Sequence, residues 1–113
     1  MKGFTDLDQS RKLEEILPIE SADMYWDYDY SIYTGEYKYY PMVMDDQFDD
    51  VCIPCWSLTA LMDVLDRGAV FKTPKGWACQ YYVEYKAITS NFHSNPVDAC
   101  VEIILEIHKQ KDK

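Results

Sequence analysis

The sequence lacks any uncharged apolar run near the ~20 residues that a membrane-spanning helix needs. Its first segment, MKGFTDLDQSRKLEE, also lacks the apolar centre of a signal peptide. These two absences favour a cytoplasmic protein that makes no contact with a membrane, where thiols stay reduced. The four cysteines, Cys52, Cys55, Cys79 and Cys100, are therefore expected to be free thiols rather than disulfides.

Positive charge is scarce in the first half of the chain. Residues 1–50 hold 13 acids and 4 bases, which accounts for the formal net charge of −9, whereas residues 51–113 hold 7 of each. Between Glu20 and Asp50 there are 9 acids and a single base, Lys38. Because such a region repels phosphate groups, we expect no direct binding of nucleic acid.

The chain does contain enough apolar material for a core. Its 113 residues, 48% of them apolar, fit a single domain, 1–113, that buries roughly two thirds of its unfolded surface. Apolar periodicity predicts helices from 6 to 17, from 54 to 67 and from 96 towards the C-terminus. Thr5 and Asn95 are the expected N-caps of the first and last helices, and Pro54 suits the first turn of the second. Gly68 is expected just beyond the end of that second helix.

Two segments alternate in the way that strands do. Segment 24–44 holds seven of the ten tyrosines, and in it Trp26, Tyr28 and Tyr30 alternate with acidic or polar residues, with Gly35 placed to close a hairpin. A Tyr-rich irregular loop would give the same pattern. Segment 69–88 predicts a second hairpin whose turn lies at 73–76. We therefore predict an α+β fold with the element order α-β-β-α-β-β-α, in which an antiparallel sheet of two hairpins packs against helices.

Three pieces of the sequence carry a resemblance: LPIESADM (17–24), IPCWSL (53–58) and NPVDACVEII (95–104). Together they resemble a group of small uncharacterised proteins of gut Bacteroidales bacteria and of their phages. The resemblance implies a phage or mobile-element accessory protein, and it implies no activity, cofactor or site residue. Where that group admits Ala, this chain has Cys55 and Cys100, which weighs against a role for either thiol.

Few residues are placed for catalysis or metal binding. Cys52 and Cys55 form one close pair, but a structural zinc site wants four such ligands, usually as two pairs. Ser57 has no surrounding Gly-x-Ser-x-Gly elbow and is expected to cap a helix, and His93 is expected in a solvated loop. We assign no catalytic residue, cofactor or metal ligand. A metal protein or small enzyme that uses Cys52 and Cys55, or the Asp45–Asp50 cluster, remains the alternative.

The Tyr-rich and Asp-rich stretch is the strongest candidate for a contact surface, because Tyr suits recognition and carboxylates select basic partners. We predict a small non-catalytic binding protein whose partner is another protein or a second copy of the chain. A structural subunit of a homo-oligomer, assembled by pairing of strand edges, is a further alternative. The residues predicted for the contact surface are Tyr25, Asp27, Asp29, Tyr33, Tyr37, Tyr40, Asp45, Asp46, Asp49 and Asp50.

Overall fold

Helix α1, Leu7–Glu14, starts at a capping box, in which the side chains of the N-cap residue and of the third helical residue each accept a hydrogen bond from the other residue's backbone N–H. In the computed structural model, which describes residues 1–111, Asp6 is the N-cap: its carboxylate accepts from the Gln9 N–H at 2.8 Å, and the Gln9 side chain accepts from the Asp6 N–H at 3.1 Å. Thr5, which we predicted as the cap, is buried instead. The helix also ends at Glu14 rather than at residue 17.

The first sheet contains the Tyr-rich hairpin and one short extra strand. Strands β1 (Met24–Ser31) and β2 (Glu36–Val43) pair antiparallel, and β3 (Ile53–Cys55) pairs with the start of β1, giving the order β2-β1-β3. The predicted hairpin is therefore an ordered one. The prediction that Pro54 starts a helix is wrong, because all of β3 is buried as a strand. Helix α2, Leu58–Val64, begins only after Ser57, whose side chain accepts from the Ala60 N–H.

The second sheet contains three consecutive strands, β4 (Gly68–Thr73), β5 (Gly76–Val83) and β6 (Lys86–Thr89), in the order β4-β5-β6. The turn between β4 and β5 lies where the sequence predicts it. The predicted hairpin of residues 69–88 has one return strand, but β5 ends at Val83 and the chain turns at 84–85, where Glu84 adopts a positive φ of 48°. Gly68, expected to follow α2 directly, is part of β4.

Helix α3, Pro96–Lys111, packs against β5 and α2 and closes the core. Its predicted N-cap is correct, since the Asn95 side chain accepts from the Asp98 N–H at 2.9 Å. The buried core lies mainly between the helices and the inner face of the second sheet. The largest fully buried apolar side chains in that core are Trp56, Leu13, Leu61, Ile103 and Val97.

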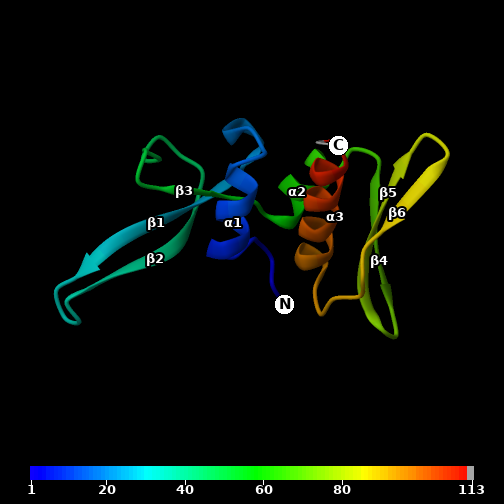
Figure 1. The fold of residues 1–113 in the computed structure, drawn as a ribbon. Helices are drawn as coiled ribbons and strands as arrows, with labels where there is room; N and C mark the ends of the chain where they lie inside the picture. Colours follow the sequence, from blue (N-terminus) through cyan, green and yellow to red (C-terminus); the bar gives the residue numbers. More distant parts are fainter. Residues whose placement is uncertain (112–113) are drawn as a thin grey trace.

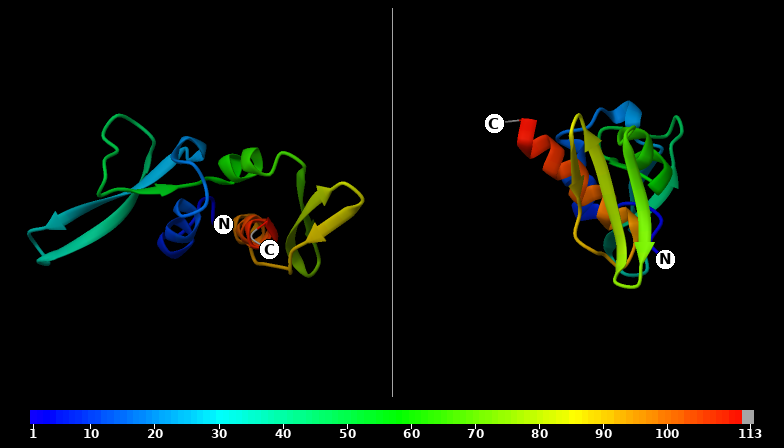
Figure 2. Two further views of the ribbon diagram at one scale, coloured as in Figure 1. Left: turned by 45° about the horizontal axis from the view of Figure 1, so that its top comes forward. Right: turned by 90° about the vertical axis from the view of Figure 1, so that its right-hand side faces the viewer.

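The two sheets lie at opposite ends of an elongated molecule, with the helices between them (Figures 1 and 2). Its extents are 54 × 32 × 23 Å. The predicted α+β class is confirmed, and the predicted element order agrees with the structure apart from two added strands, β3 and the separate β6. The two hairpins belong to separate sheets, however, and the β1–β2 hairpin extends away from the body as an arm (Figure 1).

Thr5 joins the base of this arm to the body through a buried polar network. Its N–H donates to the Trp56 carbonyl at 2.9 Å, and its hydroxyl accepts from the Trp56 N–H at 3.1 Å. The same hydroxyl lies 2.7 Å from the Ser10 hydroxyl, and the Thr5 carbonyl accepts from the Trp26 indole at 3.2 Å. One buried residue thus connects α1, β1 and the β3–α2 junction.

Each long edge of the arm has positions where a backbone donor is absent or already bonded. The Met44 N–H donates to the Asp23 carbonyl at 3.0 Å, so these two residues form a hydrogen-bonded pair. Hydrogen-bonded and non-hydrogen-bonded pairs alternate from there along β1 and β2. By that alternation the nitrogen of Pro41, a residue without an N–H, faces the outer edge of β2. On β1, beyond the part covered by β3, the outward N–H groups of Tyr28 and Tyr30 donate to the preceding side chains, Asp27 at 2.9 Å and Asp29 at 2.8 Å.

Candidate functional site

The register of the first hairpin separates its side chains into two chemically different faces. On one face Asp27 lies opposite Tyr40, and Asp29 lies opposite Lys38. The Tyr40 hydroxyl donates to the Asp27 carboxylate at 3.4 Å. We call the side formed by these four residues and by the loop of residues 45–50 the acidic face.

The opposite side of the hairpin is aromatic. Tyr28 contacts Tyr37 and Tyr39 with ring centroids 5.0 and 5.5 Å apart, and Tyr30 contacts Tyr37 at 5.1 Å. The guanidinium of Arg11 lies over the Tyr39 ring at 5.9 Å. Tyr37, which we grouped with the aspartates as one contact surface, is therefore on the other face from Asp27, Asp29 and Tyr40.

The loop of residues 45–50 is held on the acidic face by a buried tyrosine. The Tyr25 hydroxyl donates to Asp45 at 2.7 Å, and its ring packs edge-on against Phe48 with centroids 5.5 Å apart. The bond to Asp45, together with burial and the nearby charge of Asp27, raises the pKa of Tyr25 well above its ordinary value. Tyr25 is fully buried, so its predicted place on the contact surface is wrong and its role is to position the loop.

The Cys-x-x-Cys pair of the sequence is not a pair in space. The Cys52 thiol lies on the acidic face, 3.6 Å from Asp27 and 3.4 Å from Asp49. Burial is the main cause that raises its pKa to about 11, so it is a poor nucleophile. The Cys55 thiol instead contacts the buried Thr5, at 3.5 Å from its hydroxyl and 3.4 Å from its carbonyl.

The carboxylates of the acidic face are accessible to a partner. Asp29, Asp45, Asp46, Asp49 and Asp50 are exposed, and Asp27 is half-buried. Within residues 1–111, no group of three or more His, Cys, Asp and Glu side chains is placed to hold a metal ion. No helix in the same range combines the length and apolar character needed to cross a membrane. The acidic face is thus an open surface rather than a closed ligand cage.

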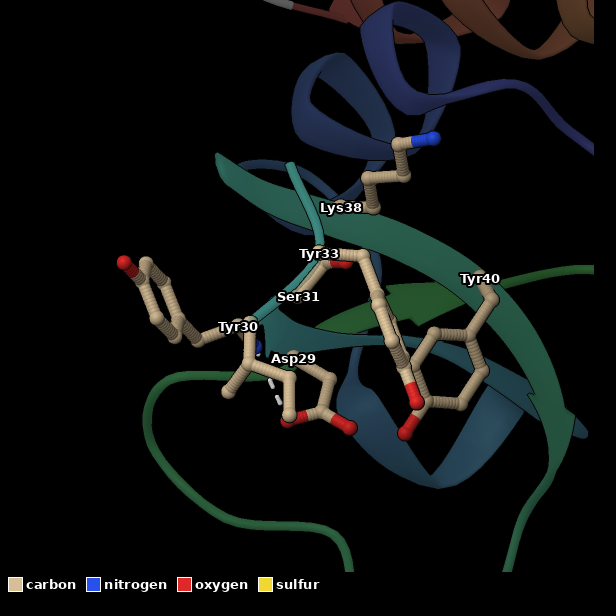
Figure 3. A pocket seen from close by; sticks show the side chains of 7 residues that line it. Asp29, Tyr30, Ser31, Tyr33, Lys38 and Tyr40 are labelled. Atoms are coloured by element: carbon tan, nitrogen blue, oxygen red, sulfur yellow. Dashed lines mark hydrogen bonds between the residues drawn. The ribbon is translucent and has the colours of Figure 1, made fainter. Parts of the chain in front are cut away.

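A cavity of about 360 Å³ lies at the tip of the arm, on the acidic face (Figure 3). Tyr33 and Tyr40 both line it, and in the view of Figure 3 their hydroxyls point toward the same end, while the side chain of Tyr30 points to the other side. The residues lining this tip cavity are Asp29, Tyr30, Ser31, Ile32, Tyr33, Lys38 and Tyr40.

No protein-family model matches the chain, and neither the comparison with curated proteins nor that with solved structures finds a match.

Sequence reasoning missed a second polar group, which lies between α1 and α3. His93 is not the solvated loop residue that we predicted, because its Nε2 lies 2.8 Å from a Glu102 oxygen. Glu102 also accepts from the N–H and the side-chain amide of Asn91. Partial burial raises the pKa of Glu102, but these hydrogen bonds outweigh it and lower the pKa overall. His93 has no sequence neighbour that signals this contact, because its partner lies in the second turn of α3.

The remaining polar side chains between α1 and α3 are also engaged with one another. Asp98 accepts from Lys2 at 2.8 Å, from Gln9 at 2.8 Å and from Asn95 at 2.9 Å. The pKa of Asp98 is lowered, since these bonds outweigh the effect of partial burial. A shallow depression of about 380 Å³ opens beside Asp98 and His93. The polar side chains there bond to one another, and the ion pair of Lys2 with Asp98 holds the N-terminal segment against α3. We therefore assign this group a structural role.

Proposed function

We propose that the protein is a non-catalytic binding protein that contacts a basic surface of a protein partner through the acidic face of its first hairpin. One observation carries the proposal: folding brings Asp27 and Asp29 of the arm together with the aspartates of the loop, which the buried Tyr25 holds there. Lys38 is the only base in the sequence between residues 20 and 50. The acidic face thus combines carboxylates of the protruding arm with those of the loop of residues 45–50.

The position of these carboxylates suits the steering of a partner. Exposed charges add little binding energy each, but together they speed the encounter with an oppositely charged surface and make binding sensitive to salt. The same charges repel nucleic acid, so the expected partner is a protein. The resemblance to phage-associated proteins makes a host protein with a basic, nucleic-acid-binding face a candidate partner.

The test uses two variants that lose the same number of charges from different places. The first carries Asp29→Asn, Asp46→Asn and Asp50→Asn on the acidic face, and the control carries Glu14→Gln, Asp63→Asn and Asp66→Asn on exposed positions elsewhere. Each immobilised protein is incubated with a bacterial lysate at low salt, and the retained proteins are quantified by mass spectrometry.

We expect the wild type and the control to retain a set of basic proteins that the acidic-face variant does not retain. These proteins should elute as the salt concentration is raised. The same set of proteins on all three columns would mean that the acidic face does not select a partner, and the proposal would have to be abandoned. Because both variants have the same net charge, a general charge effect cannot produce the expected difference.

A further inference from the structure

Two tyrosine rings line the tip cavity and are open to solvent to different degrees. Tyr33 is 93% exposed and Tyr40 is 38% exposed, although both rings carry large apolar surfaces. Their hydroxyls point the same way and their rings border one opening (Figure 3). Two neighbouring tyrosine faces present negative π-surfaces, which attract a cation within about 6 Å of the ring centre.

The carboxylate beside these rings lacks a positive partner. Asp29 faces Lys38 across the strand pair, yet no ion pair joins them in the described chain, and the amine of Lys38 is turned away from Asp29 (Figure 3). One oxygen of Asp29 accepts from the Tyr30 N–H at 2.8 Å, which leaves the other available. A carboxylate beside two aromatic faces is suited to a cation and disfavours an anion.

The electrostatic potential at Tyr40 is negative as well. Burial, followed by the charges of Asp27 and Asp29, raises the pKa of Tyr40 above its ordinary value. An anionic occupant would be repelled by these carboxylates, and the one base of the lining, Lys38, turns its amine away from Asp29 (Figure 3). Charge complementarity therefore selects a positively charged group from the partner.

We infer that the tip cavity binds an arginine side chain of the basic protein partner. A planar guanidinium stacks on a tyrosine ring and donates two parallel hydrogen bonds to a carboxylate, whereas an ammonium group is a point charge without a plane to stack. This inference rests on the proposed function and adds to it the residue that the arm recognises. Tyr33 and Tyr40 bind the face of the guanidinium, and Asp29 binds its edge.

The experiment titrates the ¹⁵N-labelled full chain with three short acetylated peptides that differ at two positions, which carry arginine, lysine or the neutral isostere citrulline. The variants are Tyr33→Ala and Asp29→Asn, and the matched controls are Tyr85→Ala, an equally exposed tyrosine in the turn of another hairpin, and Asp66→Asn. Substitution of the exposed Tyr33 leaves the fold unchanged, so loss of binding cannot be attributed to unfolding.

With the arginine peptide we expect saturable chemical-shift changes at residues 29–40. The lysine peptide should bind more weakly and the citrulline peptide should not bind. Loss of one ring should weaken arginine binding by about 2- to 5-fold, with no change in the two controls. Equal shifts with arginine and citrulline, tighter binding of lysine, or equal affinity of Tyr33→Ala and Tyr85→Ala would each overturn the inference.

These outcomes are separate from those of the lysate experiment. If the charge variant loses its partners while Tyr33→Ala keeps them, the proposed function stands and the arginine site is refuted. If the arginine peptide binds at the tip but the charge variant keeps every partner, the tip cavity binds arginine and the proposed function fails.

Discussion

Replacement of Thr5 by Val tests how the arm is attached to the body. Valine has nearly the same shape as threonine, so the change removes a hydroxyl without opening a cavity. It leaves the Trp56 N–H without its acceptor and the Ser10 hydroxyl without its partner, both at a position with no solvent access. Substitution by Ser is the matched control, because it keeps the hydroxyl and removes only a methyl group.

The magnitude follows from the number of groups left unpaired. Each buried polar group that loses its partner costs about 1–3 kcal/mol, so two of them should lower the free energy of unfolding by about 2–6 kcal/mol. Removal of the methyl group in Thr5→Ser should cost about 1 kcal/mol. If Thr5 were instead the helix cap that the sequence suggests, Thr5→Ser would be neutral and Thr5→Val would cost only about 1 kcal/mol.

Urea denaturation followed by tryptophan fluorescence measures these differences. We expect Thr5→Val to have a much lower midpoint than Thr5→Ser, with Asp6→Ala, the change at the true cap, losing about 1 kcal/mol. Equal midpoints for Thr5→Val and Thr5→Ser would refute the reasoning, because the hydroxyl would then contribute nothing. Amide exchange of β1 and β2 shows whether the loss loosens the arm or the whole domain.

Three further predictions concern other parts of the fold. Since the pKa of Asp98 is held below the ordinary value of 3.8, its contribution to stability is present above that value and is lost as the pH falls through the folded pKa; urea midpoints should fall below about pH 4, and less steeply in Asp98→Asn. The Cys52 thiol, with its pKa raised to about 11, should react with iodoacetamide at pH 8 much more slowly in the native than in the unfolded protein, and equal rates would contradict this. Ser57→Ala should cost about 1 kcal/mol in urea denaturation, because it removes the α2 cap and the hydrogen bond that the hydroxyl donates to Asp23, whereas Ser57→Thr, which keeps the hydroxyl, should retain most of the stability.

The parts of the fold that the sequence predicted are those decided by neighbours along the chain. Asn95 followed by Pro96 marks the start of α3, and the buried residues Val97 and Val101 follow the apolar periodicity that predicts this helix. The hairpin turns at 35 and 73–76 also carry their own signals in Gly and Pro. Local chemistry sets these features, so tertiary contacts do not displace them.

Features set by distant contacts were not predictable from the sequence. Ile53–Cys55 is too short to show a period, and only its pairing with β1 makes it a strand. The turn at Glu84 carries no Gly or Asn, although its φ is positive. The alternation of the first hairpin indicated Trp26 and Tyr28 as the inward face. Tyr25 is nevertheless the residue that is fully buried there, because the loop of residues 45–50 folds over its side of the sheet.

The placement of Asp27, Asp29 and Pro41 along the edges of the arm has a consequence for solubility. A protruding, tyrosine-rich hairpin is the kind of segment that recruits identical strands into fibrils. Here an incoming strand would find two donors of β1 already taken by carboxylates and one position of β2 without a donor at all. Pairing of the arm with a strand from a second copy is therefore hindered at these three positions, which lowers the tendency of the tyrosine-rich hairpin to add identical strands.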